Sequence, residues 1–387
     1  MISTLAINNY RSIRDLRIAL GPLNVITGAN GSGKSNLYRA LRLLSETAQG
    51  GVVNSLALEG GLDSAFWAGP EIFSRIARAG GAMQGGVRKE VKRLRLGFAT
   101  DLFGYSISLG LPEPSQSAFA LDPEIKQEGI WGGECYHPAG LLVERKGSII
   151  RVREGRRWQI ASEHINNFTS MFDQLADPLT APEVFHMREF IRGWRFYDHF
   201  RTDSDAPARK AQVGTRTPVL HHDGRDLAAA LQTIREIGDT QLLDESVDDA
   251  FPGASVAISR STEGLFTIQF QQHGLMRPLS GAELSDGTLR YLLWIAALLT
   301  PRPPSMMVLN EPETSLHPEL LPSLAKLIIK ASSQTQVWVI SHSPVLIAAL
   351  KQSSHCQSIQ LKKQLGETHV TDINILEEPL WRWSDKN

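Results

Sequence analysis

Eight residues near the amino end have the types and spacing that bind phosphate. Residues 28–35 read GANGSGKS, which fits the pattern G-x-x-x-x-G-K-[ST]. Glycines let several backbone N–H groups converge on one anion, and the helix that follows adds the positive end of its dipole. In this pattern Lys34 reaches the outer phosphates and acts in catalysis, and the Ser35 hydroxyl is a ligand for Mg²⁺. The predicted nucleotide contacts are Asn30, Gly31, Ser32, Gly33, Lys34, Ser35 and Asn36.

A carboxylate far downstream stands where it could activate water. Residues 306–309 (MMVL) predict a buried strand, and Asn310 and Glu311 follow at its carboxyl end. That end of a parallel strand is the edge of the sheet where ligands bind. Glu311 is therefore the predicted general base, held rigidly one residue past the strand.

A histidine follows a second apolar strand. Residues 337–340 (VWVI) end in Ser341 and His342, and Pro344 is suited to the first turn of a helix. A single histidine more often packs or faces solvent. Its place at a strand end favours the functional interpretation, in which His342 donates a hydrogen bond to the terminal phosphate.

The elements that position these residues can be predicted from apolar periodicity. Strands are expected at 5–7, 16–18 and 23–26, then a helix whose apolar stripe is Leu37, Ala40, Leu41 and Leu44. Residues 91–110 predict strands of an antiparallel sub-sheet with a further edge at 148–152, and residues 226–237 predict a helix that Asp226 caps. After strands at 256–258 and 266–270, helices at 286–299, 318–330 and 344–350 alternate with the strands at 306–309 and 337–340. The fold class is α/β, mainly a parallel sheet with an antiparallel sub-sheet and a helical insertion.

Composition excludes several classes of protein. The 387 residues are 42% hydrophobic and 21% charged with a formal net charge of −1, which is ordinary for a globular chain. A chain this close to neutral has no global field for nucleic acid or membrane, so any basic surface must be local. The two cysteines form no disulfide framework, and neither a secretory signal nor a membrane span is evident. We expect a cytoplasmic protein with no membrane contact.

Four motifs occur in the order of a known type of ATPase. The loop GANGSGKS, the turn LSDGT (284–288), the strand end NEPETSLHPELL (310–321) and the turn SHSP (341–344) resemble an ABC-type ATPase head of the SMC, RecF and OLD-like branch. Residues 9–16 look like the first strand and turn of that branch. The resemblance covers residues 1–50 and 255–350, and the whole chain is most similar to a bacterial group of stand-alone AAA family ATPases. It implies a P-loop NTPase fold.

The resemblance also implies a dimer that ATP holds together. Ser285 and Gly287 would belong to the signature loop, which contacts the nucleotide bound by a second copy, and residues 314–317 would cross the interface. Arg11 would join the nucleotide contacts. Residues 1–155 and 253–387 would form the ATPase head, with residues 156–252 as the helical insertion.

Two departures from the family pattern bear on the chemistry. Most of the superfamily has aspartate where this chain has Asn310, so one negative charge beside Mg²⁺ is missing, although an amide oxygen still accepts a hydrogen bond. Hydrolysis by such a site is expected to be slow. The superfamily's glutamine has three candidates, Gln116, Gln127 and Gln159, which the sequence does not separate.

The sequence leaves two outputs open. Local basic clusters favour duplex DNA and a role in DNA repair or antiviral defence, while the short tail after His342 implies a separate nuclease or toxin as effector. The clusters are Arg88, Lys89, Lys92, Arg93 and Arg95; Arg151, Arg153, Arg156 and Arg157; and Arg188, Arg192, Arg195 and Arg201. The alternative is a nucleotide-dependent switch with little turnover that binds a protein partner and no DNA, which Asn310 favours.

Overall fold

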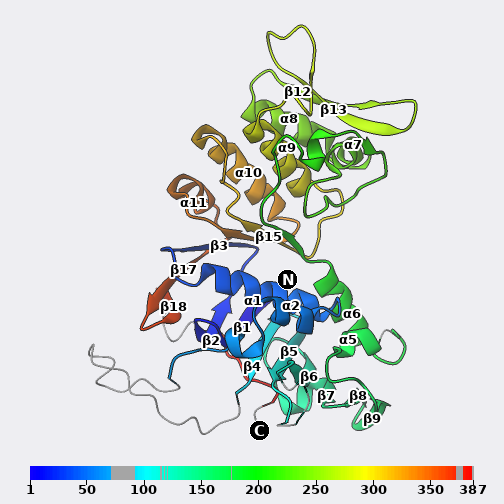
Figure 1. The fold of residues 1–387 in the computed structure, drawn as a ribbon, viewed down its shortest axis with the longest axis vertical. Helices are drawn as coiled ribbons and strands as arrows, with labels where there is room; N and C mark the ends of the chain where they lie inside the picture. The colour runs from blue at the N-terminus through cyan, green and yellow to red at the C-terminus, as the bar shows by residue number, and fades with distance from the viewer. Residues whose placement is uncertain are drawn as a thin grey trace. The chain divides into compact units, whose positions relative to one another are not determined.

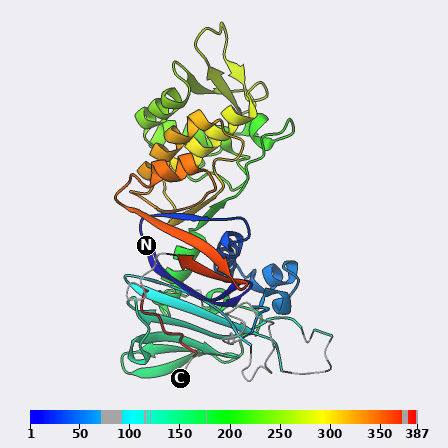
Figure 2. The ribbon, with the colours of Figure 1, turned by 90° about the vertical axis from the view of Figure 1, so that its left-hand side faces the viewer.

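The structure of the protein is a computed structural model that describes residues 1–70, 92–113, 116, 118–119, 121–175, 177–371 and 378–385. The chain forms two compact units. Unit 1 comprises residues 1–20, 28–193 and 359–387, and unit 2 comprises residues 21–27 and 194–358. Figure 1 labels most of the helices and strands, and Figure 2 shows the chain from a second direction. The predicted division at residues 155 and 253 stays a prediction.

Unit 1 is built on an antiparallel sheet, drawn from blue through cyan to green in Figure 2. Its strand order is β2-β1-β4-β5-β6-β7-β8-β9. The bounds are β1 Ile2–Tyr10, β2 Ile13–Ala19, β4 Leu94–Thr100, β5 Phe103–Gly110, β6 Glu124–Gly132, β7 Leu141–Lys146, β8 Ile149–Glu154 and β9 Arg157–Ser162. The predicted sub-sheet is therefore present. The prediction that residues 148–152 form an edge was wrong, because β8 pairs with β9, whose first four residues are exposed and show no buried alternation.

The helices in the described part of unit 1 are α1 Lys34–Thr47, α2 Val52–Leu58, α3 Leu62–Ala65, η1 Pro138–Gly140, α5 Met171–Gln174 and α6 Pro182–Arg192. The hairpin of β17 Cys356–Gln364 and β18 Glu367–Thr371 lies largely in the same unit. The predicted stripe of α1 is confirmed, because Leu37, Ala40, Leu41 and Leu44 are all fully buried. This stripe holds the helix that follows the glycine loop against the protein interior.

Unit 2 contains the parallel strands. The order is β10 Arg195–Tyr197, β15 Met306–Asn310, β16 Gln336–Ile340 and β3 Leu23–Gly28. All neighbours in this order are parallel, so their carboxyl ends lie at one edge of the sheet. The segment 156–252, predicted as a helical insertion, contributes β10 to this sheet, and that strand was missed because three residues are too few to show alternation.

The other elements of unit 2 are helices and a small antiparallel sheet. The helices are η2 Pro207–Arg209, α7 Leu227–Ile237, α8 Thr240–Ala250, α9 Asp286–Leu298, η3 Pro318–Leu320, α10 Leu321–Ala331 and α11 Pro344–Leu350; the strands are β11 Gln212–Val213, β12 Ser255–Arg260, β13 Leu265–Gln271 and β14 Leu279–Ser280. Every residue of α9 from Thr288 to Leu298 is buried, which makes this helix the centre of the unit's core. Among the residues that the structure describes, no helix is long and apolar enough to span a membrane.

One local prediction about helix capping was wrong. Asp226 occupies the N-cap position of α7, but its side chain makes no cap hydrogen bond. Its Oδ1 atom accepts instead from the main-chain N–H of His221, at 3.0 Å. The residue type was suited to a cap, but its oxygen accepts a hydrogen bond from the preceding loop instead.

Candidate functional site

The loop of residues 28–33 has a backbone that requires glycine. Gly28 has φ 147° and Gly33 has φ 110°. A Cβ atom on Gly33 would overlap Thr368 Oγ1, and one on Gly28 would overlap the main-chain oxygen of Leu361. A side chain at either position would force the neighbouring segment to move, so the two glycines let the loop pack closely against β17 and β18.

A network of hydroxyls holds this loop in place. Thr368 Oγ1 donates to the main-chain oxygen of Ser32 at 3.0 Å and lies 2.7 Å from Ser12 Oγ. Asn36 Nδ2 donates to the same Ser12 Oγ at 2.7 Å. Thr368 lies 336 positions from Ser32 in the sequence, and no local pattern predicted its role. The network therefore ties the loop to the hairpin of β17 and β18, which is far from it in the sequence.

The polar groups of the loop suit a phosphate ligand. Lys34 is only 6% exposed, and its Nζ atom donates to the main-chain oxygens of Gly28 at 2.6 Å and Ala29 at 3.0 Å. No side chain caps the N-terminus of α1, and the buried Ser32 Oγ has no hydrogen-bond partner among the described residues. An uncapped helix end, the ammonium of its first residue and an orphan hydroxyl on the adjoining loop fit an anion with several oxygens. Ser35 and Asn30 are exposed beside them.

Arg11 is engaged within unit 1. Its Nη2 atom lies 2.9 Å from Glu59 Oε2, and its Nε atom donates to the same oxygen at 3.1 Å. The Tyr10 hydroxyl also donates to this carboxylate, at 2.7 Å. Burial, followed by the hydrogen bond to Glu59, raises the pKa of Tyr10 far above its ordinary value. The predicted contact between Arg11 and nucleotide stays a prediction, and it would require Arg11 to share or leave Glu59.

In unit 2 the strand ends bring three predicted residues together. Asn310 is the last residue of β15 and pairs in register with Ile340 of β16. Glu311 follows in the left-handed region, with φ 50°, and its N–H donates to the Ile340 main-chain oxygen at 2.8 Å. Glu311 Oε1 lies 3.2 Å from His342 Nε2, with the two side chains 47% and 38% exposed. A strained backbone thus presents a solvent-accessible carboxylate–imidazole pair.

Glu313 fixes the turn that carries His342. Its Oε1 atom accepts from Ser341 Oγ at 2.7 Å and from the main-chain N–H groups of His342 at 2.8 Å and Ser343 at 3.0 Å. Its Oε2 atom is buried and has no hydrogen-bond partner among the described residues. This carboxylate ties the loop after β15 to the turn after β16. The sequence motif includes Glu313 but predicted no role for it; a second carboxylate two residues past Glu311 was the available signal.

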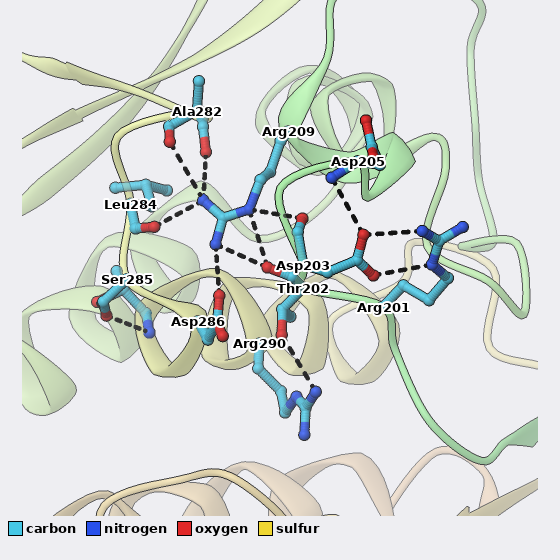
Figure 3. Close-up of polar contacts among 12 residues, drawn as sticks. Arg201, Thr202, Asp203, Asp205, Arg209, Ala282, Leu284, Ser285, Asp286 and Arg290 are labelled. Atoms are coloured by element: carbon cyan, nitrogen blue, oxygen red, sulfur yellow. Dashed lines mark hydrogen bonds and ion pairs between the residues drawn. The ribbon is translucent and has the colours of Figure 1, made fainter.

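The predicted signature residues begin α9. Ser285 is the N-cap, and its Oγ accepts from the Thr288 N–H at 3.1 Å. Arg290, on the same helix, donates from Nη1 to the main-chain oxygen of Thr314 at 2.8 Å. Figure 3 shows the start of this helix and the arginine side chains around it. The loop after Glu311 is therefore bonded directly to the helix that the signature turn begins.

Several cations of the predicted basic clusters already have partners. Arg88 and Lys89 lie outside the described residues. Arg95 forms an ion pair with Asp385 at 2.7 Å, Arg151 pairs with Glu144, and Arg201 pairs with Asp203 at 2.8 Å. These pairs reduce the charge that each cluster offers to a phosphodiester backbone, so DNA binding stays a prediction.

The arrangement defines a class of protein. A glycine loop that continues a parallel strand, a carboxylate one residue past a second strand and a histidine after a third are features of a P-loop ATPase of the AAA and ABC type. The sequence profile of the family described as "AAA domain, putative AbiEii toxin, Type IV TA system" matches residues 23–348. The chain belongs to this AAA family.

One solved structure confirms the fold, and two others are also similar to the chain. The chain is similar to "Crystal structure of the SmcHead bound to the C-winged helix domain of ScpA", with a TM-score of 0.53 and 14% identity over 97% of this chain and 99% of that one. An Smc head from Pyrococcus furiosus matches with a TM-score of 0.49 and 13% identity over 97% of each chain, and one from Thermotoga maritima with 0.43 and 13% over 97% and 99%. No curated protein matches the chain. The predicted fold class, a P-loop NTPase of the SMC head type, is confirmed.

Proposed function

We propose that the chain binds ATP with Mg²⁺ and hydrolyses it in a dimer whose two copies enclose the nucleotide. The observation that carries this proposal is the order of the parallel strands. β15, β16 and β3 are adjacent and parallel, and they lead into Glu311, into His342 and into the glycine loop. In open parallel sheets the ligand binds outside the carboxyl ends of the strands, which is where these residues stand.

Each residue has a role that follows from its chemistry. Lys34 leaves the loop carbonyls to hold the outer phosphates, while the N–H groups of the loop and of α1 hold the rest. Glu311 accepts a proton from the attacking water, and His342 donates a hydrogen bond to the terminal phosphate. Ser35 and Asn310 supply the hard oxygen atoms that Mg²⁺ prefers. The bound cation would neutralise phosphate charge as it develops.

The dimer would complete the site from the second copy. Ser285 and Gly287 stand at the N-terminus of α9, which carries the positive end of the helix dipole. The bond between Arg290 and Thr314 joins this helix to the loop that follows Glu311. A phosphate bound by one copy and contacted by α9 of the other would therefore link the catalytic loop to the interface. Nucleotide would hold two copies together, and hydrolysis would release them.

The output we propose is a switch that acts on duplex DNA or on a separate nuclease or toxin, in DNA repair or antiviral defence. The family description names a toxin and a toxin–antitoxin system, and one of the similar SMC heads was solved with a winged-helix domain of another protein bound to it. Both support a head that works through a partner. Asn310 supports the second candidate function, a slow nucleotide-dependent switch that binds a protein and no DNA.

Titration calorimetry with ATP and Mg²⁺ tests the central proposal. We expect uptake by the wild-type chain, and Lys34→Ala should weaken it by at least about tenfold, because a charge-assisted contact to phosphate is lost. Lys351→Ala is the matched control, since that exposed lysine lies at the end of α11. Undiminished uptake by the Lys34→Ala chain would contradict the proposal.

The hydrolysis rate with and without linear duplex DNA separates the two outputs. DNA stimulation that charge reversal at Lys92 and Arg93 removes would support a DNA-acting head. A low rate that DNA leaves unchanged would support the protein switch. Lys92 and Arg93 are residues of the first basic cluster that the structure describes.

A further inference from the structure

The side chain of Arg209 is enclosed by main-chain oxygens of two segments. Arg209 is the last residue of η2, and its side chain is 8% exposed. On one side it donates to the segment that precedes it: Nε to the Thr202 oxygen at 2.9 Å and the Asp203 oxygen at 3.1 Å, and Nη2 to the Thr202 oxygen at 2.8 Å. On the other side Nη1 donates to the oxygens of Gly281 at 3.0 Å and Leu284 at 2.6 Å. Figure 3 shows the guanidinium between the two segments.

The second segment is the turn that leads into α9. Leu284 immediately precedes the N-cap Ser285, so a bond to its carbonyl fixes the direction in which the helix begins. The two backbones also lie close together at this point. A Cβ atom on Gly281 would lie only 3.1 Å from the Arg209 main-chain oxygen. The planar guanidinium has five N–H donors in fixed directions, so it holds both segments in one geometry.

Arg209 also neutralises a carboxylate at the start of α9. Its Nη2 atom lies 2.6 Å from Asp286 Oδ1, and the Asp286 side chain is 63% exposed. Asp286 follows Ser285 and precedes Gly287, the residues proposed to contact the nucleotide of the second copy. An unpaired carboxylate there would repel a triphosphate, whereas the pair with Arg209 cancels the charge and holds it to one side.

We propose that Arg209 is a positioning residue for the signature turn, which it orients through the carbonyls of residues 281–284 and prepares for an anionic ligand by pairing Asp286. This inference rests on the proposed function, because it assigns a role within the ATP-bound dimer. The guanidinium itself touches no nucleotide. The two effects are separable, since the carbonyl contacts set geometry and the Asp286 contact sets charge.

The test measures ATP-dependent dimerisation by sedimentation in a Glu311→Gln background, in which bound ATP persists. Arg209→Ala should weaken the dimer by at least about tenfold, because a buried charged donor set is lost beside the contact. ATP uptake by the dilute monomer should stay unchanged. Arg201→Ala is the matched control: Arg201 lies in the same segment and pairs with Asp203, but both side chains are half exposed and the turn is not touched.

A second substitution separates a charge effect from damage to the fold. Adding Asp286→Asn to Arg209→Ala should recover part of the lost dimerisation, since the repulsive carboxylate is then gone; a purely structural loss would not recover. Arg209→Lys keeps the positive charge but loses the planar set of donors. Its ATP-dependent dimerisation should therefore be weaker than that of the wild type and stronger than that of Arg209→Ala. The lysine variant also provides the test if the Arg209→Ala chain does not fold.

The outcomes distinguish this inference from the proposed function. Wild-type dimerisation by both Arg209 variants would overturn the positioning role of Arg209. A loss in Arg209→Ala that Asp286→Asn does not reduce would overturn the charge effect at Asp286. Both results would leave ATP uptake and its dependence on Lys34 intact. Absence of ATP uptake by the parent chain would overturn the proposed function instead.

Discussion

Two carboxylates, one in each unit, have opposite surroundings. Glu128 of β6 is 0% exposed, and both oxygens are fully used. Oε1 accepts from the Tyr105 hydroxyl at 2.8 Å and from Ser170 Oγ at 2.6 Å, while Oε2 accepts from Arg145 Nη1 and the Met171 N–H at 2.8 and 2.9 Å. Glu311 is 47% exposed, and its carboxylate faces the His342 imidazole at 3.2 Å.

The difference separates a carboxylate that holds the fold from one that can react. Burial, with the Glu128 carboxylate beside it, raises the pKa of Tyr105 well above its ordinary value, so this network keeps its protons in place. A saturated carboxylate has no lone pair left for a substrate. Glu311 is half exposed on a strained turn, which leaves it lone pairs for the proton that our proposal has it take from water.

Glu313 lies between these extremes. One of its oxygens accepts three hydrogen bonds, and the other is buried and has no partner among the described residues. Its contacts are to the turn that carries His342, so it belongs to the site without being open to it. The three carboxylates therefore form a series from fully bonded and buried to exposed, and substitution can test whether their roles follow that series.

The largest expected effect is on stability, at Glu128. Glu128→Ala should lower the free energy of unfolding by about 3–5 kcal/mol, because it leaves the fully buried Arg145 guanidinium without its counter-charge. Urea unfolding monitored by circular dichroism measures the change. Asp203→Ala is the control: it breaks an exposed ion pair and should cost much less stability, because exposed pairs are screened by solvent. Similar losses in both variants would show that burial does not set the difference.

The next effect is on chemistry, at Glu311. Glu311→Gln should lower ATP hydrolysis by about 10²–10⁴-fold, the usual contribution of a general base. ATP uptake should persist, and stability should stay within about 0.5 kcal/mol of wild type, as for most exposed positions. Phosphate release measures the hydrolysis rate, and titration calorimetry measures ATP uptake. A hydrolysis rate that does not change would remove Glu311 from the catalytic role.

The sequence predicted those parts of the site whose signals are local. The glycine loop and the carboxylate and histidine at strand ends each depend on fewer than about ten neighbouring residues, and periodicity places the elements around them. The buried stripe of α1 and the alternation of α9, β15, α10, β16 and α11 were predicted for the same reason.

What the sequence did not predict depends on contacts between distant segments. Thr368 supports the glycine loop across 336 positions, and Arg209 reaches Leu284 across 75. No local pattern reports such pairs, since they form only when the chain has folded. β10 is too short for a periodic signal, and the Asp226 cap failed because the N–H of His221, in a preceding turn, competed for its oxygen.

The smallest expected effect is at Glu313, and it tests whether this residue resembles Glu128 or Glu311 more closely. Glu313→Ala removes the acceptor for Ser341, His342 and Ser343, so the turn that aims His342 should loosen and hydrolysis should fall by about tenfold, since a bond to a charged group contributes about 1.5–3 kcal/mol. Glu313→Gln keeps an oxygen acceptor of the same length and should restore most of the rate. Steady-state kinetics measures both. If the glutamine chain is as slow as the alanine chain, the negative charge matters more than the hydrogen bonds, and Glu313 then stands closer to Glu311 than to Glu128.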